Sequence, residues 1–270
     1  MIIKPQQRIL TVGDGDLSFS HALWQHHQPA LLCASVLDSE QQLNDKYQQH
    51  QLYELKEAGC QVLTGFDVTN PKSWGDLPTQ QFDLVIFQFP LLPAFDDQQD
   101  FLRQCEGISV NTLNRKLLRQ YLIHCQQYFL DSQGEQLCYI TSKDVKPYRE
   151  WNIEQSIHQK TNLHYLGSSL FDIANFPGYR VRNVDRDKHV KDTQGITYVW
   201  SPQADHAIRA QLKAAEFVGE NYCTPCRAGP FGNQQQRNDH MTSRKHKLMA
   251  EYEQQWKSLL TRVKYHHQID

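Results

Sequence analysis

Two glycines and three aspartates near the N-terminus have the types and spacing of a nucleoside-binding turn. Residues 8–20 read Arg-Ile-Leu-Thr-Val-Gly-Asp-Gly-Asp-Leu-Ser-Phe-Ser. The apolar part predicts a buried strand, Gly13 and Gly15 allow a tight turn that a ligand can approach closely, and Ser18 can cap the next helix. A second apolar run ends on Asp38, where such folds place a carboxylate for ribose hydroxyls. We predict a βαβ unit that binds a nucleoside; a purely structural turn is the alternative.

The charges of this turn indicate the kind of nucleoside. Asp14 and Asp16 would repel the pyrophosphate of a dinucleotide, by about 1 kcal/mol per close charge pair even in water. Ser18 also stands where a dinucleotide turn usually has its third glycine. S-adenosylmethionine has an adenosine but no phosphate, and carboxylates attract its ammonium and sulfonium groups. The turn therefore favours S-adenosylmethionine and disfavours an NAD-dependent oxidoreductase.

Four residues near the C-terminus have the types and spacing of zinc ligands. Cys223 and Cys226 are followed by His240 and His246, in the pattern C-x2-C-x13-H-x5-H. Two thiolates and two imidazoles are a tetrahedral ligand set suited to Zn²⁺. The histidine spacing resembles the U1-like, matrin-type zinc fingers, which are associated with RNA binding. Because one finger has little core of its own, we expect the metal to be its main folding force.

Basic residues gather around this predicted finger. The whole chain has a formal net charge of −2, yet residues 227–264 hold eight Lys or Arg and three acidic residues. Any affinity for nucleic acid must therefore come from a local patch. We predict that it consists of Arg237, Arg244, Lys245 and Lys247, which suit phosphate contacts. A finger that docks a protein, or that only stabilises the fold, is the alternative.

Length, cysteine content and apolar runs indicate the general class of this protein. A chain of 270 residues can form one large domain and a small appendage. Five of the seven cysteines are scattered, as in proteins of a reducing compartment. The N-terminus has no signal-peptide pattern, and no apolar run is long enough to span a membrane. We expect a soluble cytoplasmic protein without a membrane partner, and leave the oligomeric state open.

The residues around these motifs alternate between strand and helix patterns. They predict a doubly wound α/β sheet whose last two strands are antiparallel and have no full helix between them. Residues 40–58 and 111–130 are expected to be helices, and residues 91–107 an irregular substrate loop. The predicted strands include residues 9–12, 31–37, 62–68, 82–89, 134–141, 163–171 and 196–200. The predicted divisions are a domain of residues 1–202, a linker helix of residues 203–218, and a finger with a basic helix over residues 219–270.

Seven sequence blocks occur in the order of a known family. The chain resembles the Rossmann-like methyltransferases typified by the large-subunit (25S) rRNA uridine-N3 methyltransferase, over about residues 8–184. The resemblance implies the seven-stranded sheet of class I methyltransferases, S-adenosylmethionine as methyl donor and a uridine in structured rRNA as acceptor. The blocks are residues 13–20, 35–39, 46–47, 65–68, 82–90, 147–153 and 176–179.

The resemblance also implies roles for individual residues. Gly13, Asp14 and Gly15 would line the methionine end of the donor, Asp38 would bind the ribose, and Asp67 would accept a hydrogen bond from the adenine amino group. The implied donor site is completed by Asp16, Ser18, Phe19, Ser39 and Val68.

Four further residues are candidates for acting on the acceptor. Gln88 could hydrogen-bond a carbonyl of the base, Phe89 could stack on its face, and Pro90 follows them. Lys143, after the fifth predicted strand, could stabilise the imide anion that develops on the base. A solvated lysine after a strand is the alternative for Lys143.

Two segments depart from the family pattern. The family usually reads Asn-Phe-Pro where this chain has Gln88-Phe89-Pro90. Its habitual His and Arg-Thr after the Pro-Gly-Tyr block become Val181 and the pair at 183–184. We therefore keep a second hypothesis beside the enzyme: a non-catalytic RNA-binding or ribosome-assembly factor that retains the methyltransferase fold.

Overall fold

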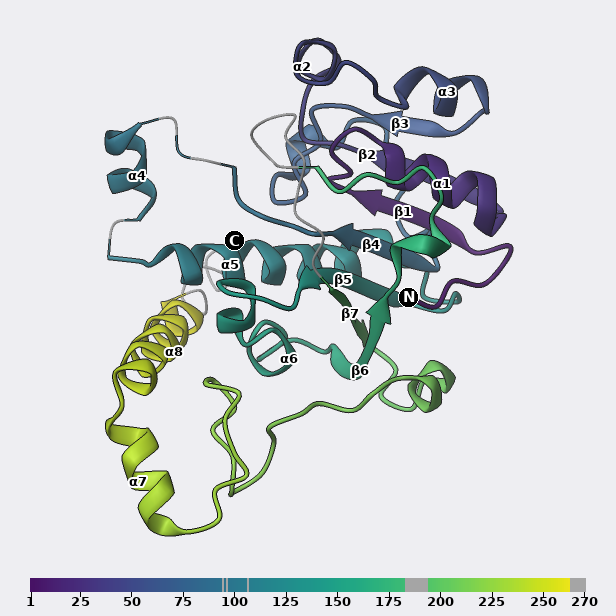
Figure 1. The fold of residues 1–270 in the computed structure, drawn as a ribbon. Helices are drawn as coiled ribbons and strands as arrows, with labels where there is room; N and C mark the ends of the chain where they lie inside the picture. Colours follow the sequence, from purple (N-terminus) through teal and green to yellow (C-terminus); the bar gives the residue numbers. More distant parts are fainter. Residues whose placement is uncertain (94, 96, 106, 183–193, 263–270) are drawn as a thin grey trace.

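A seven-stranded sheet forms the centre of the molecule (Figure 1). The computed structural model describes residues 1–93, 95, 97–105, 107–182 and 194–262. The strand order is β3-β2-β1-β4-β5-β7-β6; β1 to β5 are parallel, and β7 runs antiparallel to both of its neighbours. The predicted fold class is confirmed. The strands are β1 Arg8–Val12, β2 Leu31–Ser35, β3 Gln61–Leu63, β4 Leu84–Gln88, β5 Leu137–Lys143, β6 His164–Phe171 and β7 Gly195–Ser201.

Helices cover both faces of the sheet, and the strands alternate to match them. On β4, Val85 and Phe87 belong to the apolar cluster of one face, while Leu84 and Ile86 belong to the cluster of the other. This alternation follows from the two-residue period of a strand, and burial on both faces explains its continuous apolar sequence. The first six helices are α1 Ser18–His27, α2 Glu40–Lys46, α3 Leu52–Glu57, α4 Gln98–Gln104, α5 Val110–His124 and α6 Ile153–Ser156.

The helix predicted over residues 40–58 is wrong, because the chain forms α2 and α3 with a break between them. Tyr47 has an extended backbone at the end of α2. The N–H of Gln51 then donates to the carbonyl of Asp16 at 3.0 Å. The break returns the chain to the glycine turn, so a tertiary contact overrides the helical periodicity. The expected irregular stretch of residues 91–107 also contains α4.

The linker helix predicted over residues 203–218 is wrong as well. Only a short 3-10 helix, Ala207–Gln211, forms there. Lys213 instead pairs with Ser168 on the edge strand β6, through N–H···O bonds of 2.8 and 2.9 Å. The connector therefore runs in extended form along the sheet edge, where unpaired strand groups satisfy its backbone.

The C-terminal region ends in two helices, α7 Gln234–Thr242 and α8 Arg244–Arg262. Helix α8 packs against α5, as Figure 1 shows in yellow and teal. The guanidinium of Arg115 on α5 is fully buried, 2.9 Å from Glu253 and 4.7 Å from the centre of the Trp256 ring. Trp256 also donates from Nε1 to the carbonyl of Ser156 at 3.1 Å. The C-terminal helix is thus docked onto the sheet domain.

Among the described residues, none of the helices has both the length and the apolar character required to cross a membrane.

Candidate active site and zinc centre

A cavity of about 270 Å³ lies beyond the carboxyl ends of β1, β2 and β4. In parallel α/β sheets this edge is where ligands bind. The structure brings most predicted site residues to its wall, whereas Ser18, Phe19, Ser39 and Lys143 are not among the described residues that line it. The predicted residues in the wall are Gly13, Asp14, Gly15, Asp16, Asp38, Asp67, Val68, Gln88, Phe89 and Pro90.

Gly13 and Gly15 are required by both backbone geometry and space. Their φ angles are +65° and +40°, in the left-handed region that side chains disfavour. A Cβ at Gly13 would lie 2.7 Å from Cε2 of Phe87, and one at Gly15 would lie 3.3 Å from Cβ of Arg182. The turn can therefore bring bare backbone to the cavity only with glycine at these two positions.

Asp14 holds the first turn of α1. Its buried carboxylate accepts hydrogen bonds from the backbone N–H groups of Phe19 and Ser20, at 3.3 and 2.6 Å, and from the Ser20 hydroxyl. Burial raises the pKa of Asp14 to about 7, although these hydrogen bonds oppose the shift. The prediction that Ser18 caps this helix is wrong: Ser18 is its first residue, and its Oγ accepts from the N–H of Arg180 at 3.0 Å.

Asp16 is held by an arginine that the sequence analysis did not include. Nε of Arg182 lies 2.5 Å from a carboxylate oxygen of Asp16, and both side chains are largely buried. Arg182 follows Tyr179 and Arg180 on a segment that lines the cavity and contacts the glycine turn. The ion pair balances one of the two negative charges at the turn. The sequence signal was the pair of arginines directly after the Pro-Gly-Tyr block.

The other predicted donor residues divide into cavity wall and support. Asp38 is paired with Lys46 at 2.9 Å, and Oδ1 of Asp67 accepts from the N–H of Thr69 at 2.8 Å; both aspartates line the cavity. Ser39 instead caps α2 through a capping box with Gln42. Phe19 is fully buried against the rings of two aromatic residues in the core, so it supports the turn from behind. The predicted role of each residue in binding the donor stays a prediction.

Gln88 presents an unsatisfied amide to the cavity. Its side chain is only 6% exposed, and neither Nε2 nor Oε1 has a hydrogen-bond partner among the described residues. A buried amide without partners costs about 1–3 kcal/mol, so such groups commonly mark a place for a ligand. The next residue, Phe89, has a φ of +47° and packs edge-to-face on Phe171 at 5.7 Å. Strained backbone of this kind clusters at functional sites.

Lys143 lies at the end of β5 but is outside the described cavity wall. Its Nζ is 5.9 Å from the centre of the Tyr148 ring, and burial lowers the pKa of the ammonium. The structure therefore does not bring Lys143 together with Gln88, and its role toward the acceptor stays a prediction.

The four predicted zinc ligands converge in the C-terminal region. The ligand atoms of Cys223, Cys226, His240 and His246 all lie within 4.8 Å of one another, as in a tetrahedral site. Nδ1 of His246 is 3.4 Å from Sγ of Cys223 and 3.6 Å from Sγ of Cys226. The backbones of Cys223 and Ala228 exchange two hydrogen bonds, which form the knuckle that holds both thiols. The donor set and its geometry fit Zn²⁺.

The four predicted basic residues of the finger have different surroundings. Lys245 donates from Nζ to the carbonyl of Cys226 at 2.8 Å, so it stabilises the knuckle. Arg237 donates to the backbone carbonyl of Glu220 at 2.6 Å. This contact does not neutralise the charge of the guanidinium. Arg244 and Lys247 are exposed on α8.

Comparisons with known proteins identify relatives of this chain. Three related proteins are similar in sequence. An uncharacterised Arabidopsis thaliana protein is 29% identical over 64% of this chain and 79% of its own. The heavy metal-associated isoprenylated plant protein 41 of the same plant is 32% identical over 66% of this chain, which spans 33% of that protein. The 25S rRNA (uridine(2634)-N(3))-methyltransferase of Saccharomyces cerevisiae is 22% identical over 79% of this chain and 78% of its own.

Among solved structures, a 30S ribosomal A1408 methyltransferase from an uncultured bacterium aligns with a TM-score of 0.40 and 14% identity, over 73% of this chain and 88% of that one. A family model described as rRNA (uridine-N3-)-methyltransferase BTM5-like matches residues 10–183, which is more than half of the chain and contains every residue of the cavity wall. The chain therefore belongs to this family of rRNA methyltransferases.

Proposed function

We propose that the protein transfers a methyl group from S-adenosylmethionine to N3 of a uridine in rRNA, and that a zinc finger helps to bind that RNA. The observation that carries the proposal is the meeting, in one cavity, of the Gly13–Gly15 turn, the carboxylate of Asp38 and the unsatisfied amide of Gln88. Family membership supports the reaction class.

The donor half of the cavity suits an adenosine. Asp38, at the end of β2, can accept hydrogen bonds from ribose hydroxyls. Asp67 can accept from the adenine amino group, and the bare turn at Gly13 leaves room for the methionine end. When bound, S-adenosylmethionine supplies an electrophilic methyl carbon. Asp14 accepts hydrogen bonds from the start of α1, and Asp16 forms an ion pair with Arg182. The two acids therefore hold the backbone of the glycine turn in place and also determine the charge of the turn.

The acceptor half suits a uracil. The amide of Gln88 can donate from Nε2 to a carbonyl oxygen beside N3, and this group has no hydrogen-bond partner within the described part of the chain. Holding the base in line with the donor contributes to the rate through orientation, on the order of 7–11 kcal/mol at best. As the new N–C bond forms, the C–S bond would break and release S-adenosylhomocysteine, and the N3 proton would pass to water. We keep Lys143 as the candidate for stabilising the developing negative charge; a Lys143→Met variant with unchanged turnover at every pH would remove this role.

Zinc would hold the C-terminal finger together through Cys223, Cys226, His240 and His246. A finger with so few apolar residues depends on its metal for folding. We propose that Arg237, Arg244 and Lys247 then contact RNA phosphates, while Lys245 is engaged at the knuckle.

The decisive experiment is nucleoside mass spectrometry of rRNA from cells with and without this protein, combined with transfer of labelled methyl groups to that rRNA by the purified protein. We expect N3-methyluridine to disappear at one position and to be restored by the protein. Calorimetry with S-adenosylmethionine tests the donor separately. Donor binding without any transfer would favour the RNA-binding assembly factor, and absence of donor binding would refute the proposal.

A further inference from the structure

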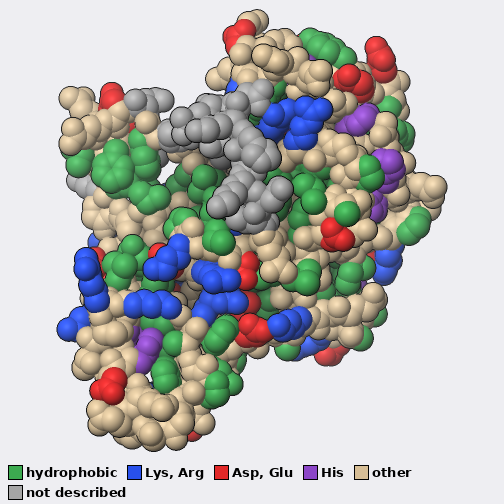
Figure 2. Space-filling model, in the orientation of Figure 1, with side chains coloured by type: hydrophobic (Ala, Val, Ile, Leu, Met, Phe, Trp, Pro, Cys, Tyr) green, Lys and Arg blue, Asp and Glu red, His purple; other side chains and the backbone are tan. Residues whose placement is uncertain are grey.

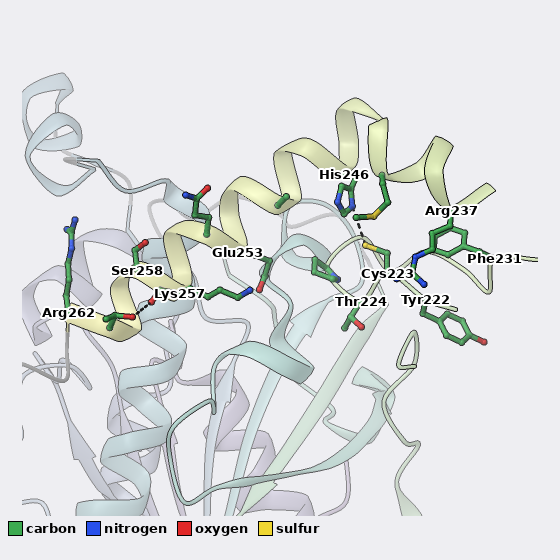
Figure 3. Close-up of a pocket in the computed structure, with 15 residues that line it drawn as sticks. Tyr222, Cys223, Thr224, Phe231, Arg237, His246, Glu253, Lys257, Ser258 and Arg262 are labelled. Carbon is green, nitrogen blue, oxygen red and sulfur yellow. Dashed lines mark hydrogen bonds between the residues drawn. The ribbon is translucent and has the colours of Figure 1, made fainter. Parts of the chain in front are cut away.

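A second hollow, of about 900 Å³, lies between α8 and the zinc knuckle (Figure 3). One side is a face of α8 beside the face that packs on α5, and the other is formed by the knuckle and part of α7. Figure 3 shows Arg262, Ser258 and Lys257 along α8 on one side, and Tyr222, Phe231 and Arg237 at the opposite end. The hollow is therefore elongated along α8, and it is separate from the methyl-transfer cavity.

The charge of this hollow is positive. Lys257 and Arg262 are exposed, and neither forms an ion pair with any described residue. The partner of Arg237 among the described residues is the backbone carbonyl of Glu220, so no described acid neutralises its charge. Glu253 is the one acid among the described lining residues, and it is already engaged by Arg115 at 2.9 Å and Asn152 at 3.3 Å.

Aromatic side chains accompany Arg237 at one end of the hollow. Tyr222 and Phe231 line the hollow near Arg237, and each is partly exposed. Cations in a row beside accessible rings are the combination by which proteins hold single-stranded nucleic acid, with phosphates on the cations and bases on the rings. An acidic peptide is the alternative occupant, and the test below distinguishes it from RNA.

The surface around the hollow also carries positively charged side chains. Figure 2 shows Lys and Arg side chains gathered over α8 and the adjoining part of the sheet domain. Of the finger residues predicted from sequence to contact RNA, only Arg237 lines the hollow. Lys257 and Arg262 lie further along the chain, and the folded helix brings them to the same hollow.

We propose that this hollow binds a single-stranded segment of the RNA substrate, with phosphates at Arg237, Lys257 and Arg262 and a base against Tyr222 or Phe231. The inference rests on the proposed RNA acceptor and adds the place and the strandedness of its contact with the C-terminal region. Because α8 is docked on α5, RNA held here has a fixed position relative to the sheet domain.

The test uses the zinc-loaded full chain and a short, uridine-rich, fluorescently labelled single-stranded RNA. The double variant Lys257→Glu/Arg262→Glu reverses two charges of the hollow. Lys72→Glu/Arg209→Glu is the matched control, since both of its residues are exposed and lie outside the hollow. We expect the first variant to weaken binding at least about tenfold and to reduce the slope of log K against log salt by about 1.4, and the control to do neither. Zinc content and the melting temperature check that both variants are folded.

Other outcomes separate this inference from the proposed function. If Arg244→Glu/Lys247→Glu weakens RNA binding while Lys257→Glu/Arg262→Glu does not, the hollow is not the RNA site, and the proposed RNA role of the finger stands. If the hollow variant loses affinity for an acidic peptide but not for RNA, the hollow serves a protein partner and the inference is overturned. If the unaltered protein binds no RNA, both proposals fail.

Discussion

The amide of Gln88 has no hydrogen-bond partner among the described residues, and we expect the acceptor base to supply one. Gln88→Leu deletes both unsatisfied atoms without leaving a large void. We expect the free energy of unfolding to stay the same or to rise, while kcat/KM for RNA methylation falls at least about tenfold, or ~1.4 kcal/mol. Urea unfolding and steady-state kinetics measure the two effects. Gln25→Leu, on the exposed face of α1, is the control. Unchanged kinetics would show that this amide does not contact the acceptor.

The raised pKa of Asp14 should make the stability of the folded protein depend on pH. Its pKa in the folded protein is raised from 3.8 to about 7, so the folded state holds this proton more tightly than the unfolded state. The stabilisation is therefore present at low pH and is lost as pH rises from about 4 to 7, by up to about 1.4 kcal/mol per pH unit. Asp14→Asn should show a flatter dependence of unfolding free energy on pH over this window.

Urea unfolding at several pH values between 4 and 7 gives the comparison. Asp76→Asn is a suitable control, because Asp76 is exposed. The same slope in Asp14→Asn and in the unaltered protein would contradict the assignment.

At the scale of elements, the contact of α8 with α5 is the part of the fold that carries the clearest energetic consequence. Glu253→Gln leaves the buried Arg115 without its charged partner, and breaking a buried pair on one side costs about 3 kcal/mol or more. Trp256→Ala removes a fully buried ring and should cost about 3–5 kcal/mol. Thermal unfolding and hydrogen exchange of α5 amides measure these losses.

Glu251→Gln provides the matched control, because Glu251 is exposed on the same helix. If Glu253→Gln were as stable as this control, the Arg115–Glu253 pair would not stabilise the docking of α8.

Some of the helices and strands could be predicted from the sequence, and others could not. The parallel strands were predictable because apolar runs such as Leu84–Gln88 are buried on both faces of the sheet. The break after α2 was not, since it depends on a bond between Gln51 and the distant turn at Asp16. The burial of Arg115 was equally hidden: its partner, Glu253, is remote in sequence, and an arginine inside a helix ordinarily predicts an exposed face.

The site was predictable to a similar extent and for similar reasons. Spacing alone identified the four metal ligands, because a zinc knuckle is a local structure with strict geometry. Glycines and acids at strand ends identified the polar turn of the cavity wall and two of its aspartates, Asp38 and Asp67. Arg182 was missed because its contact with Asp16 joins two segments that only the folded sheet brings together.

For the whole molecule, the metal and the sheet domain should be energetically coupled. The zinc ligand His246 lies in the first turns of α8, and the same helix docks on α5 through Trp256. Removing zinc with a chelator should therefore unfold the finger and also lower the melting temperature of the sheet domain. Tryptophan fluorescence during heating, together with zinc content, measures both.

Cys223→Ser/Cys226→Ser should reproduce the effect of the chelator. Cys105→Ser should not, because Cys105 lies outside the metal cluster. If neither the chelator nor the double variant changed the melting temperature of the sheet domain, the stabilities of the finger and the sheet would be independent.

The buried guanidinium of Arg115 has an evolutionary consequence. This position lies in the segment that the family shares, yet its charge is balanced by a helix beyond the shared segment. Without α8, the guanidinium at this position would have no acid facing it. Relatives whose chains stop after the sheet should carry an uncharged side chain at this place in α5, so the two features should be inherited or lost as a pair.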